Sequence, residues 1–380
     1  MRTVNKIMSV LLIACMAAFG LYPILRTPAE FSPTERRPLK QAPDFSAEAF
    51  FSGDYAEKSA AFLLDQTAGR DFWLSLKGET QYRAGAGDNG RIYFADKDYM
   101  MEMQREISGE RLERNISDFI AFKQKYFPGE EKPAALLLLP SAAGVYPELL
   151  PPAAPEAPQS PLLRAAKRQA EAGGLIFPRV YERLISAKSG SDQLYFRTDH
   201  HWTQHGAAKA ADAWRQALKK EDPQKDYRVA LQSKDFAGTT LAKGKRFFYT
   251  PDRIESYIAR SQDAICLYDA EGELLRKGIY DPEALKGYDQ YTYFTGDNRD
   301  FLRIETGEHS GGHLLLIKDS YANALIPFLC PYFERITVVD LRYYGESMEE
   351  LMARGPYDEL LFVYNVVTLA EDNNTFKLLN

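Results

Sequence analysis

Residues 313–321 read His-Leu-Leu-Leu-Ile-Lys-Asp-Ser-Tyr, an apolar run that ends in a polar turn. Two similar runs follow it, Ile-Thr-Val-Val-Asp-Leu at 336–341 and Glu-Leu-Leu-Phe-Val-Tyr at 359–364. Short apolar runs of this kind predict buried strands. The connection at 321–333 predicts a helix with a kink at Pro327. Strands that alternate with helices over short connections predict a parallel sheet.

The residues upstream extend this α/β pattern. Residues 101–127 place apolar side chains three to four positions apart, which predicts an amphipathic helix, and residues 134–139 predict another buried strand. Residues 264–268 and 273–280 flank a turn and predict a β-hairpin. We interpret the segment 226–300 around this hairpin as a β-rich insertion. The expected fold class is therefore α/β, with a central, mostly parallel sheet.

Length and composition exclude several classes of protein. The 380 residues predict two or three domains, or one large domain with insertions. Hydrophobic residues make up 45% of the chain and charged residues 26%, with a net charge of -6, which is typical of a globular protein. A mildly acidic chain without a basic block is a poor nucleic-acid binder. The three cysteines, Cys15, Cys266 and Cys330, form no C-x-x-C pair, which excludes a zinc cluster and a disulfide framework.

The N-terminus carries the longest apolar run of the chain. Residues 7–25 contain no charged side chain, and Arg2 and Lys6 precede them. As a helix, this run spans about 28 Å, close to the roughly 30 Å of a bilayer's hydrocarbon core. We expect an uncleaved signal anchor that makes this a single-pass protein of the cell membrane, with residues 30–380 outside the cytoplasm. The alternatives are a cleavable signal peptide and a lipoprotein signal around residues 12–15.

The predicted organisation has five segments. Pro28, Pro33, Pro38 and Pro43 favour an extended stalk after the anchor, because each proline fixes its φ angle and removes a hydrogen-bond donor. In chain order, we expect the N-terminal signal anchor at 1–28, the stalk at 29–50, the N-terminal part of the folded domain at 51–225, the β-rich insertion at 226–300, and the C-terminal part at 301–380.

Polar residues gather where the three C-terminal strands end. In an open parallel sheet, ligands bind beyond the carboxyl ends of the strands, so we expect a site at this edge. Lys318, Asp319 and Ser320 follow the first strand, residues 342–345 follow the second, and Asn365 follows the third. Ser320 lies at a strand-to-helix turn, where its hydroxyl shares one place with the free N–H groups of the helix. It can act as a nucleophile or only cap the helix.

A serine nucleophile needs a base, and one segment with histidines suits that task. The segment is Thr-Asp-His-His-Trp at 198–202. In an extended stretch or a tight turn, residues i and i+2 point the same way, so Asp199 and His201 can face one site together, with Trp202 packed beside the imidazole. Two other interpretations are a helix start with a capping aspartate and exposed histidines, and a zinc site, for which no third ligand is visible.

The run Thr-Asp-His-His-Trp-Thr-Gln-His-Gly-Ala at 198–207, followed much later by a strand that ends in Lys-Asp-Ser-Tyr, resembles the DHHW family. This family is similar to the AlgJ and AlgX polysaccharide O-acetyltransferases of the SGNH hydrolase superfamily. The resemblance implies an SGNH-like, three-layer α/β/α fold with a permuted order of motifs. It also implies a catalytic triad in which Asp199 is the acid, His201 the base and Ser320 the nucleophile.

The resemblance extends to the neighbours of the triad. Asn365 resembles the asparagine that donates a side-chain N–H to the oxyanion, whereas Lys318 replaces the glycine that precedes the aspartate-serine pair. The oxyanion glycine has only Gly345 as a candidate. Four residues are expected to contact the oxyanion or the substrate: Asn365, Trp202, Tyr321 and Arg342.

The implied function is acetyl transfer to a cell-surface or secreted polysaccharide, outside the cytoplasm, through an acyl-serine. Two alternatives stay open, an acetylesterase with the same triad and a non-catalytic glycan-binding component of a polysaccharide assembly. We expect no cofactor and no metal. The expected partners are the polysaccharide, the membrane through the N-terminal helix, and a membrane-bound O-acyltransferase that supplies the acyl group; no nucleic acid is expected.

Overall fold

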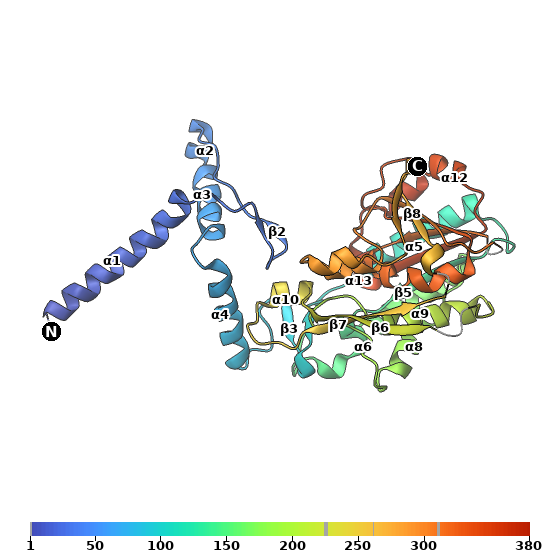
Figure 1. Cartoon of the computed structure of the whole chain (residues 1–380), viewed down its shortest axis with the longest axis horizontal. Coiled ribbons are helices and arrows are strands. Elements are labelled where there is room, and N and C mark those ends of the chain that lie inside the picture. The colour runs from blue at the N-terminus through green and yellow to red at the C-terminus, as the bar shows by residue number, and fades with distance from the viewer. Residues whose placement is uncertain (1, 224–226, 261, 310–311) are drawn as a thin grey trace. The chain divides into compact units, whose positions relative to one another are not determined.

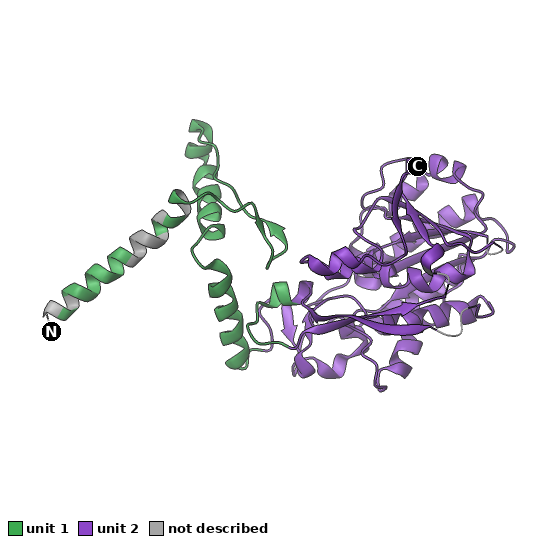
Figure 2. Ribbon diagram, viewed as in Figure 1, with its two compact units in different colours: residues 1–86, 241–249 green, residues 87–240, 250–380 purple. Residues whose placement is uncertain are grey.

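The computed structural model describes residues 2–223, 227–260, 262–309 and 312–380 (Figure 1). The chain divides into two compact units, shown in Figure 2. Residues 1–86 and 241–249 form the first unit, and residues 87–240 and 250–380 form the second. A short segment from the middle of the chain therefore belongs to the N-terminal unit.

The N-terminal unit consists of helices and one small hairpin. The hairpin lies within the segment predicted to be an extended stalk, and Arg37 links it to a helix by donating hydrogen bonds of 2.7 and 2.8 Å to the carboxylate of Asp65. Within the part of the chain that the structure describes, no helix has the length and apolar character that a membrane crossing needs. The elements are α1 (Arg2–Leu25), β1 (Phe31–Ser32), β2 (Arg37–Pro38), α2 (Ala47–Ser52), α3 (Asp54–Asp65) and α4 (Arg70–Arg83).

A seven-stranded sheet forms the centre of the second unit, in the order β5-β13-β11-β12-β10-β8-β9. The first four strands are parallel, which confirms the predicted arrangement of the three C-terminal strands. The others pair antiparallel, so the sheet is mixed, and the predicted hairpin is confirmed as its β8–β9 edge. The strands are β5 (Ala134–Leu139), β8 (Cys266–Tyr268), β9 (Leu274–Lys277), β10 (Phe301–Glu305), β11 (His313–Lys318), β12 (Arg335–Val339) and β13 (Glu359–Asn365).

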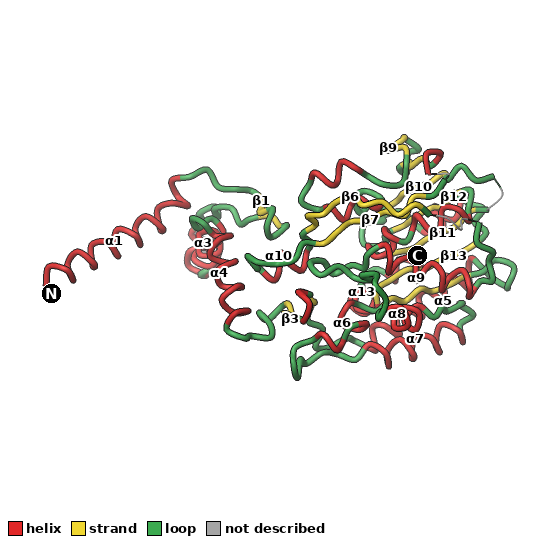
Figure 3. The backbone as a smooth tube through the Cα atoms, turned by 60° about the horizontal axis from the view of Figure 1, so that its bottom comes forward, coloured by secondary structure: helices red, strands yellow, loops and turns green. Residues whose placement is uncertain are grey.

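Helices cover both faces of this sheet, which confirms the α/β class and gives three layers (Figure 3). Successive side chains of a strand point to opposite faces. In β5, Leu137 and Leu139 therefore belong to one apolar core, and Leu136 and Leu138 to the other. The first core includes α6 (Ala142–Val145), α8 (Val180–Ala187), α9 (Gln204–Ala217) and α11 (Ile326–Leu329); the second includes α5 (Gly109–Tyr126), α7 (Gln159–Ala172), α12 (Met348–Ala353) and α13 (Val366–Glu371).

Two smaller two-stranded sheets and one short helix lie in the segments of chain that connect the elements described above. The sheets pair β3 (Ile92–Phe94) with β4 (Met100–Glu102), and β6 (Arg228–Phe236) with β7 (Asp252–Ile258). Helix α10 (Thr239–Gly244) lies between β6 and β7. The predicted helix at 101–127 starts later than expected, at Gly109, because its first residues form β4 instead.

The single helix predicted at 321–333, with a kink at Pro327, is divided into three short helical pieces. The chain forms a 3-10 helix over Ser320–Ala324, then α11, and then a second 3-10 turn over Cys330–Tyr332. Pro327 and Pro331 interrupt the helix, because neither has the backbone N–H that a continuous helix uses. Ser320 consequently begins a tight 3-10 turn directly after β11.

Candidate active site

The Thr-Asp-His-His-Trp segment forms a turn in front of α9 that is held at both ends. The buried carboxylate of Asp252, in β7, accepts hydrogen bonds from the N–H of Thr198 at 2.7 Å and from its hydroxyl at 2.6 Å. At the other end, the N–H of Thr203 donates to the carbonyl of Leu194 at 2.9 Å. The Thr203 hydroxyl also caps α9 by accepting from the N–H of Gly206.

Three of the predicted residues form one continuous chain of hydrogen bonds. His201 Nδ1 lies 2.6 Å from Oδ1 of Asp199, and His201 Nε2 lies 2.8 Å from Oγ of Ser320. Asp199 and His201 are buried, whereas Ser320 is partly exposed. Because the carboxylate of Asp199 holds the proton on Nδ1, Nε2 of His201 can accept the proton of the serine hydroxyl. This geometry suits a serine that is activated by a base.

Asp319 shapes the turn that presents Ser320. Its Oδ1 accepts a hydrogen bond from the N–H of Tyr321 at 2.9 Å, and its Oδ2 accepts one from the N–H of Asn365 at 2.8 Å. Asp319, rather than Ser320, therefore caps the 3-10 helix, and the Ser320 hydroxyl faces His201. Burial raises the pKa of the Asp319 carboxyl to about 6.

Two aromatic residues connect the Asp-His-His-Trp turn to the Ser320 turn. Nε1 of Trp202 donates to the carbonyl of Tyr321 at 2.9 Å, and the hydroxyl of Tyr321 donates to the carbonyl of His200. Both side chains are buried. These two hydrogen bonds fix the two turns relative to each other. The expected contact of Trp202 and Tyr321 with the substrate stays a prediction.

Tyr291 completes the surroundings of the base and was not expected from the sequence. Its ring stacks on the His201 imidazole, with centroids 3.7 Å apart and planes 4° from parallel. Its hydroxyl donates to the carbonyl of Ser320 at 3.1 Å. Tyr291 lies in a 3-10 helix (Gln290–Phe294) within the segment that we interpreted as an insertion. It therefore orients His201 and Ser320 together.

Thr239 and Gly238 hold Asp199 and were also not expected. The N–H and hydroxyl of Thr239 donate to Oδ2 of Asp199 at 2.7 and 2.9 Å. A Cβ atom at Gly238 would lie only 2.2 Å from the Cβ of Asp199, so the chain needs glycine at this close approach. With His201 on Oδ1 and Thr239 on Oδ2, both oxygens of the carboxylate are occupied.

The environment keeps the Asp199 carboxylate charged and the His201 imidazole neutral. Burial opposes the charge on Asp199, but the adjacent imidazoles of His200 and His201 and the donors of Thr239 outweigh it and hold the pKa of Asp199 well below its usual value. For His201, burial and the neighbouring His200 lower the pKa to about 4, against the opposing effect of Asp199. At neutral pH, His201 is therefore ready to accept a proton.

The depressed pKa of His201 predicts how activity depends on pH. We expect kcat/KM for an acetyl ester to persist at about pH 5 and to fall as the pH drops through about 4, because protonated His201 cannot act as a base. A histidine with an ordinary pKa of about 6.5 would lose activity two units higher. An acid limb near pH 6.5 that disappears only in a His201 variant would contradict this expectation.

Asn365 is the last residue of β13, and Arg342 follows the end of β12. Oδ1 of Asn365 caps α13 by accepting from the N–H of Val367. Its Nδ2 is buried and has no hydrogen-bond partner among the described residues. Arg342 is different, because its guanidinium pairs with Asp340 at 2.6 and 2.8 Å.

Lys318, which stands where a glycine was expected, and Gly345, the candidate for the oxyanion glycine, have different surroundings. Lys318 is buried, and its ammonium group lies 3.0 Å from Oδ1 of Asn323 and 3.4 Å from Oδ2 of Asp340. Burial lowers the pKa of Lys318. Gly345 lies exposed, with open space where a Cβ atom would be. Among the described residues, no hydrogen bond joins Gly345 to the group around Ser320.

The possible metal ligands of the zinc alternative are close together but already hydrogen-bonded. One possible ligand atom from each of Asp199, His200 and His201 lies within 4.8 Å of the others. Both carboxylate oxygens and the Nδ1 atoms of both histidines already take part in hydrogen bonds, however, and Nε2 of His201 faces Ser320. A metal ion would have to replace these hydrogen bonds, so the donor atoms fit the observed hydrogen bonds better than a metal centre.

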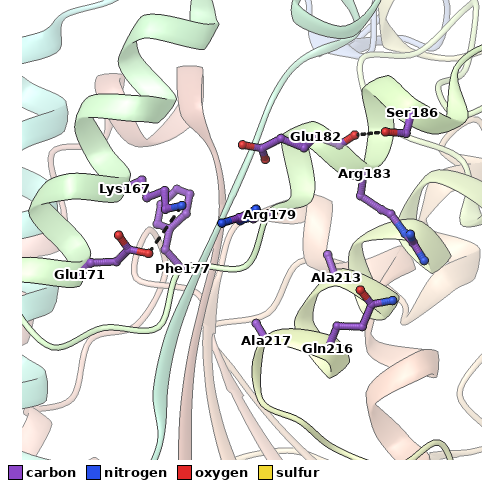
Figure 4. Close-up of a pocket in the computed structure, with 10 residues that line it drawn as sticks. All are labelled: Lys167, Glu171, Phe177, Arg179, Glu182, Arg183, Ser186, Ala213, Gln216 and Ala217. Atoms are coloured by element: carbon purple, nitrogen blue, oxygen red, sulfur yellow. Dashed lines mark hydrogen bonds and ion pairs between the residues drawn. The ribbon is translucent and has the colours of Figure 1, made fainter.

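A separate cavity of about 440 Å³ lies away from these residues. Figure 4 shows Arg179 between the side chains of Lys167 and Arg183. Phe177, in its wall, follows Ile176, which pairs with Ala135 near the amino end of β5. Ser320 follows the carboxyl end of β11, so this cavity lies at the opposite edge of the sheet. It is lined by Lys167, Glu171, Phe177, Arg179, Glu182, Arg183, Ser186, Ala213, Gln216 and Ala217.

Comparison with protein families confirms the resemblance expected from the sequence. Residues 173–339 match a family model described as DHHW protein. The matched range contains Asp199, His201 and Ser320. No curated protein matches the chain.

Several solved structures are similar to this chain. A DHHW family protein from Eubacterium siraeum DSM 15702 has a TM-score of 0.62 and 22% identity, over 76% of this chain and 94% of that chain. Bacillus cereus PatB1 with a sulfonyl adduct has a TM-score of 0.56 and 18% identity, over 76% and 99%. The O-acetyltransferase domain of Pseudomonas putida AlgJ has a TM-score of 0.49 and 15% identity, over 74% and 93%. The first two likenesses confirm the SGNH-like α/β fold.

Proposed function

We propose that this protein is an O-acetyltransferase that acts outside the cytoplasm on a cell-surface or secreted polysaccharide, through an acyl-serine intermediate. The observation that carries the proposal is the chain of hydrogen bonds from Asp199 through His201 to Ser320, with distances of 2.6 and 2.8 Å. A serine with an oriented base beside it forms acyl intermediates. The fold shared with a DHHW family protein and with PatB1 supports the same kind of function.

In the first step, the acetyl group moves from a donor ester to Ser320. His201 Nε2 accepts the hydroxyl proton while Oγ attacks the carbonyl carbon of the donor. The carbon-oxygen bond to the leaving group then breaks, and His201 returns the proton to the leaving oxygen. Asp199 keeps the imidazole in the required tautomer and stabilises its positive charge.

The negative oxygen of the tetrahedral intermediate needs hydrogen-bond donors. We assign this task to Nδ2 of Asn365, which is buried and unpartnered among the described residues, and to the backbone N–H of Ser320. One donor of this kind typically contributes about 3 to 4 kcal/mol to transition-state stabilisation. The proposal needs no cofactor and no metal ion.

In the second step, a glycan hydroxyl takes the acetyl group from Ser320. His201 accepts the proton of the attacking hydroxyl, the bond between the acyl carbon and Oγ breaks, and Oγ recovers a proton from His201. Water in place of the glycan would make the protein an acetylesterase. Both reactions use the same triad, so the acceptor alone distinguishes them.

The proposal also includes where in the cell the protein acts and which partner supplies the acetyl group. The uncharged run at 7–25 favours a signal anchor, which would keep the folded part near the outer face of the cell membrane. Acetyl groups outside the cytoplasm must be delivered there. We therefore include a membrane-bound O-acyltransferase as the partner that supplies them.

The test measures whether the acetyl group is transferred to a sugar when water competes for it. The purified full chain is incubated with p-nitrophenyl acetate, with and without a neutral oligosaccharide, and free acetate and acetylated sugar are both measured. The proposal predicts that the sugar takes acetyl groups that otherwise go to water. Release to water alone would favour the acetylesterase, and no release of p-nitrophenol would favour the glycan-binding component.

A further inference from the structure

His200, next to His201, is a second imidazole at the site, and one of its two ring nitrogens is hydrogen-bonded within the protein. Its Nδ1 lies 2.6 Å from the hydroxyl oxygen of Thr239. Its ring contacts the His201 ring, with centroids 3.8 Å apart. The His200 side chain is 30% exposed, whereas Asp199 and His201 are buried. His200 is thus the accessible one of the two imidazoles.

The hydrogen bonds determine which nitrogen of His200 carries the proton. The Thr239 hydroxyl has a single proton and donates it to Oδ2 of Asp199 at 2.9 Å. Its oxygen must therefore accept from His200, so Nδ1 of His200 carries the proton. In the neutral ring, Nε2 is then unprotonated and is a hydrogen-bond acceptor. Among the residues that the structure describes, no side chain donates to it.

Both imidazoles are consequently oriented by one carboxylate. His201 is held directly through Oδ1 of Asp199, and His200 is held through Thr239 on Oδ2. In its neutral form, each ring presents Nε2 as an acceptor, and that of His201 faces Ser320. The site therefore offers two neighbouring acceptors, of which His201 must take the proton of the attacking hydroxyl.

We propose that Nε2 of His200 accepts a hydrogen bond from a second hydroxyl of the acceptor, adjacent to the one that attacks the acyl-serine. This assignment rests on the proposed function and specifies its acceptor as a compound with neighbouring hydroxyl groups, such as a sugar. Water and simple alcohols have no second hydroxyl, so they cannot make this hydrogen bond to His200. His200 thereby favours transfer to a diol over hydrolysis.

Two substitutions separate the two nitrogen atoms of His200. His200→Asn keeps a donor near the Nδ1 position for Thr239 and removes the acceptor at Nε2. His200→Gln keeps an acceptor near the Nε2 position and removes the donor to Thr239. His205→Asn is the matched control, because His205 lies on α9 and bonds to Tyr257 and Glu255 instead.

The experiment measures how the acyl-enzyme of the full chain divides between two acceptors. Ethanediol and ethanol compete for the acetyl group from p-nitrophenyl acetate, and the ratio of the two esters is compared among variants. We expect wild type, His200→Gln and His205→Asn to prefer ethanediol. In His200→Asn, the preference should fall about tenfold, as for the loss of one hydrogen bond.

The outcomes also separate this inference from the proposed function. A burst of p-nitrophenol in wild type and in His200→Asn shows that acylation is intact in both. With that burst present and transfer to the alcohols observed, an unchanged preference in His200→Asn would overturn the role of His200 alone. Release of acetate to water alone in wild type would count against the proposed transfer and this inference together. Absence of the burst in wild type would overturn the proposed function and this inference with it.

Discussion

Ser320→Ala is expected to lower kcat for acetyl release by about 10⁶-fold, the size of effect seen when the serine of a comparable triad is removed. Without Oγ, no acyl-enzyme forms, and the Asp199–His201 pair has no hydroxyl to activate. The residual rate reflects attack by water on a bound ester. The measurement is release of acetate from an acetyl ester by the full chain, over a range of enzyme concentrations.

A matched serine controls for the substitution itself. Ser186 lies on α8, and its hydroxyl donates to the carbonyl of Glu182, so Ser186→Ala should leave kcat unchanged. Thermal unfolding of both variants checks that each is folded. Equal rates in wild type and in a folded Ser320→Ala would eliminate Ser320 as the nucleophile.

Asp199→Asn is expected to lower kcat by about 10⁴-fold while leaving the protein folded. Both oxygens of Asp199 accept hydrogen bonds, from His201 on Oδ1 and from Thr239 on Oδ2. An asparagine presents a donor in place of one of these acceptors. If its amide faces His201, the imidazole is held in the wrong tautomer, and Nε2 no longer accepts the proton of Ser320.

Asp212→Asn is the control for loss of a carboxylate near the same helix. Asp212 lies on α9 and pairs with Arg183 and Arg215. We expect this variant to keep the wild-type kcat at neutral pH. A fall of less than about tenfold in Asp199→Asn would show that the tautomer of His201 does not limit the reaction.

The strands could be predicted because their signal is local. A continuous apolar run such as 313–317 is buried on both faces of a covered sheet, and each run found in the sequence is a strand in the structure. The helix expected at 321–333 with a kink at Pro327 is three short pieces in the structure, because Pro331 as well as Pro327 lacks the backbone N–H that a longer helix uses. The chain position of Ser320, at the end of a parallel strand, followed from topology alone.

The residues that pack around Asp199 and His201 could not be predicted in the same way. Asp199 and His201 are two residues apart and share a short motif, so their proximity was visible. Tyr291, Thr239 and Gly238 reach the site only through tertiary packing. Nothing in their local sequence distinguishes a tyrosine that stacks on a base from one that lies at the edge of the core.

The most direct test of the account is the site of the covalent intermediate. The full chain is mixed with p-nitrophenyl acetate, quenched in acid during the burst, digested, and analysed by peptide mass spectrometry. The account predicts one acetyl group on Ser320 in wild type, and none on that peptide in His201→Ala. An acetyl group found on another side chain, with Ser320 unmodified while p-nitrophenol is released, would contradict it.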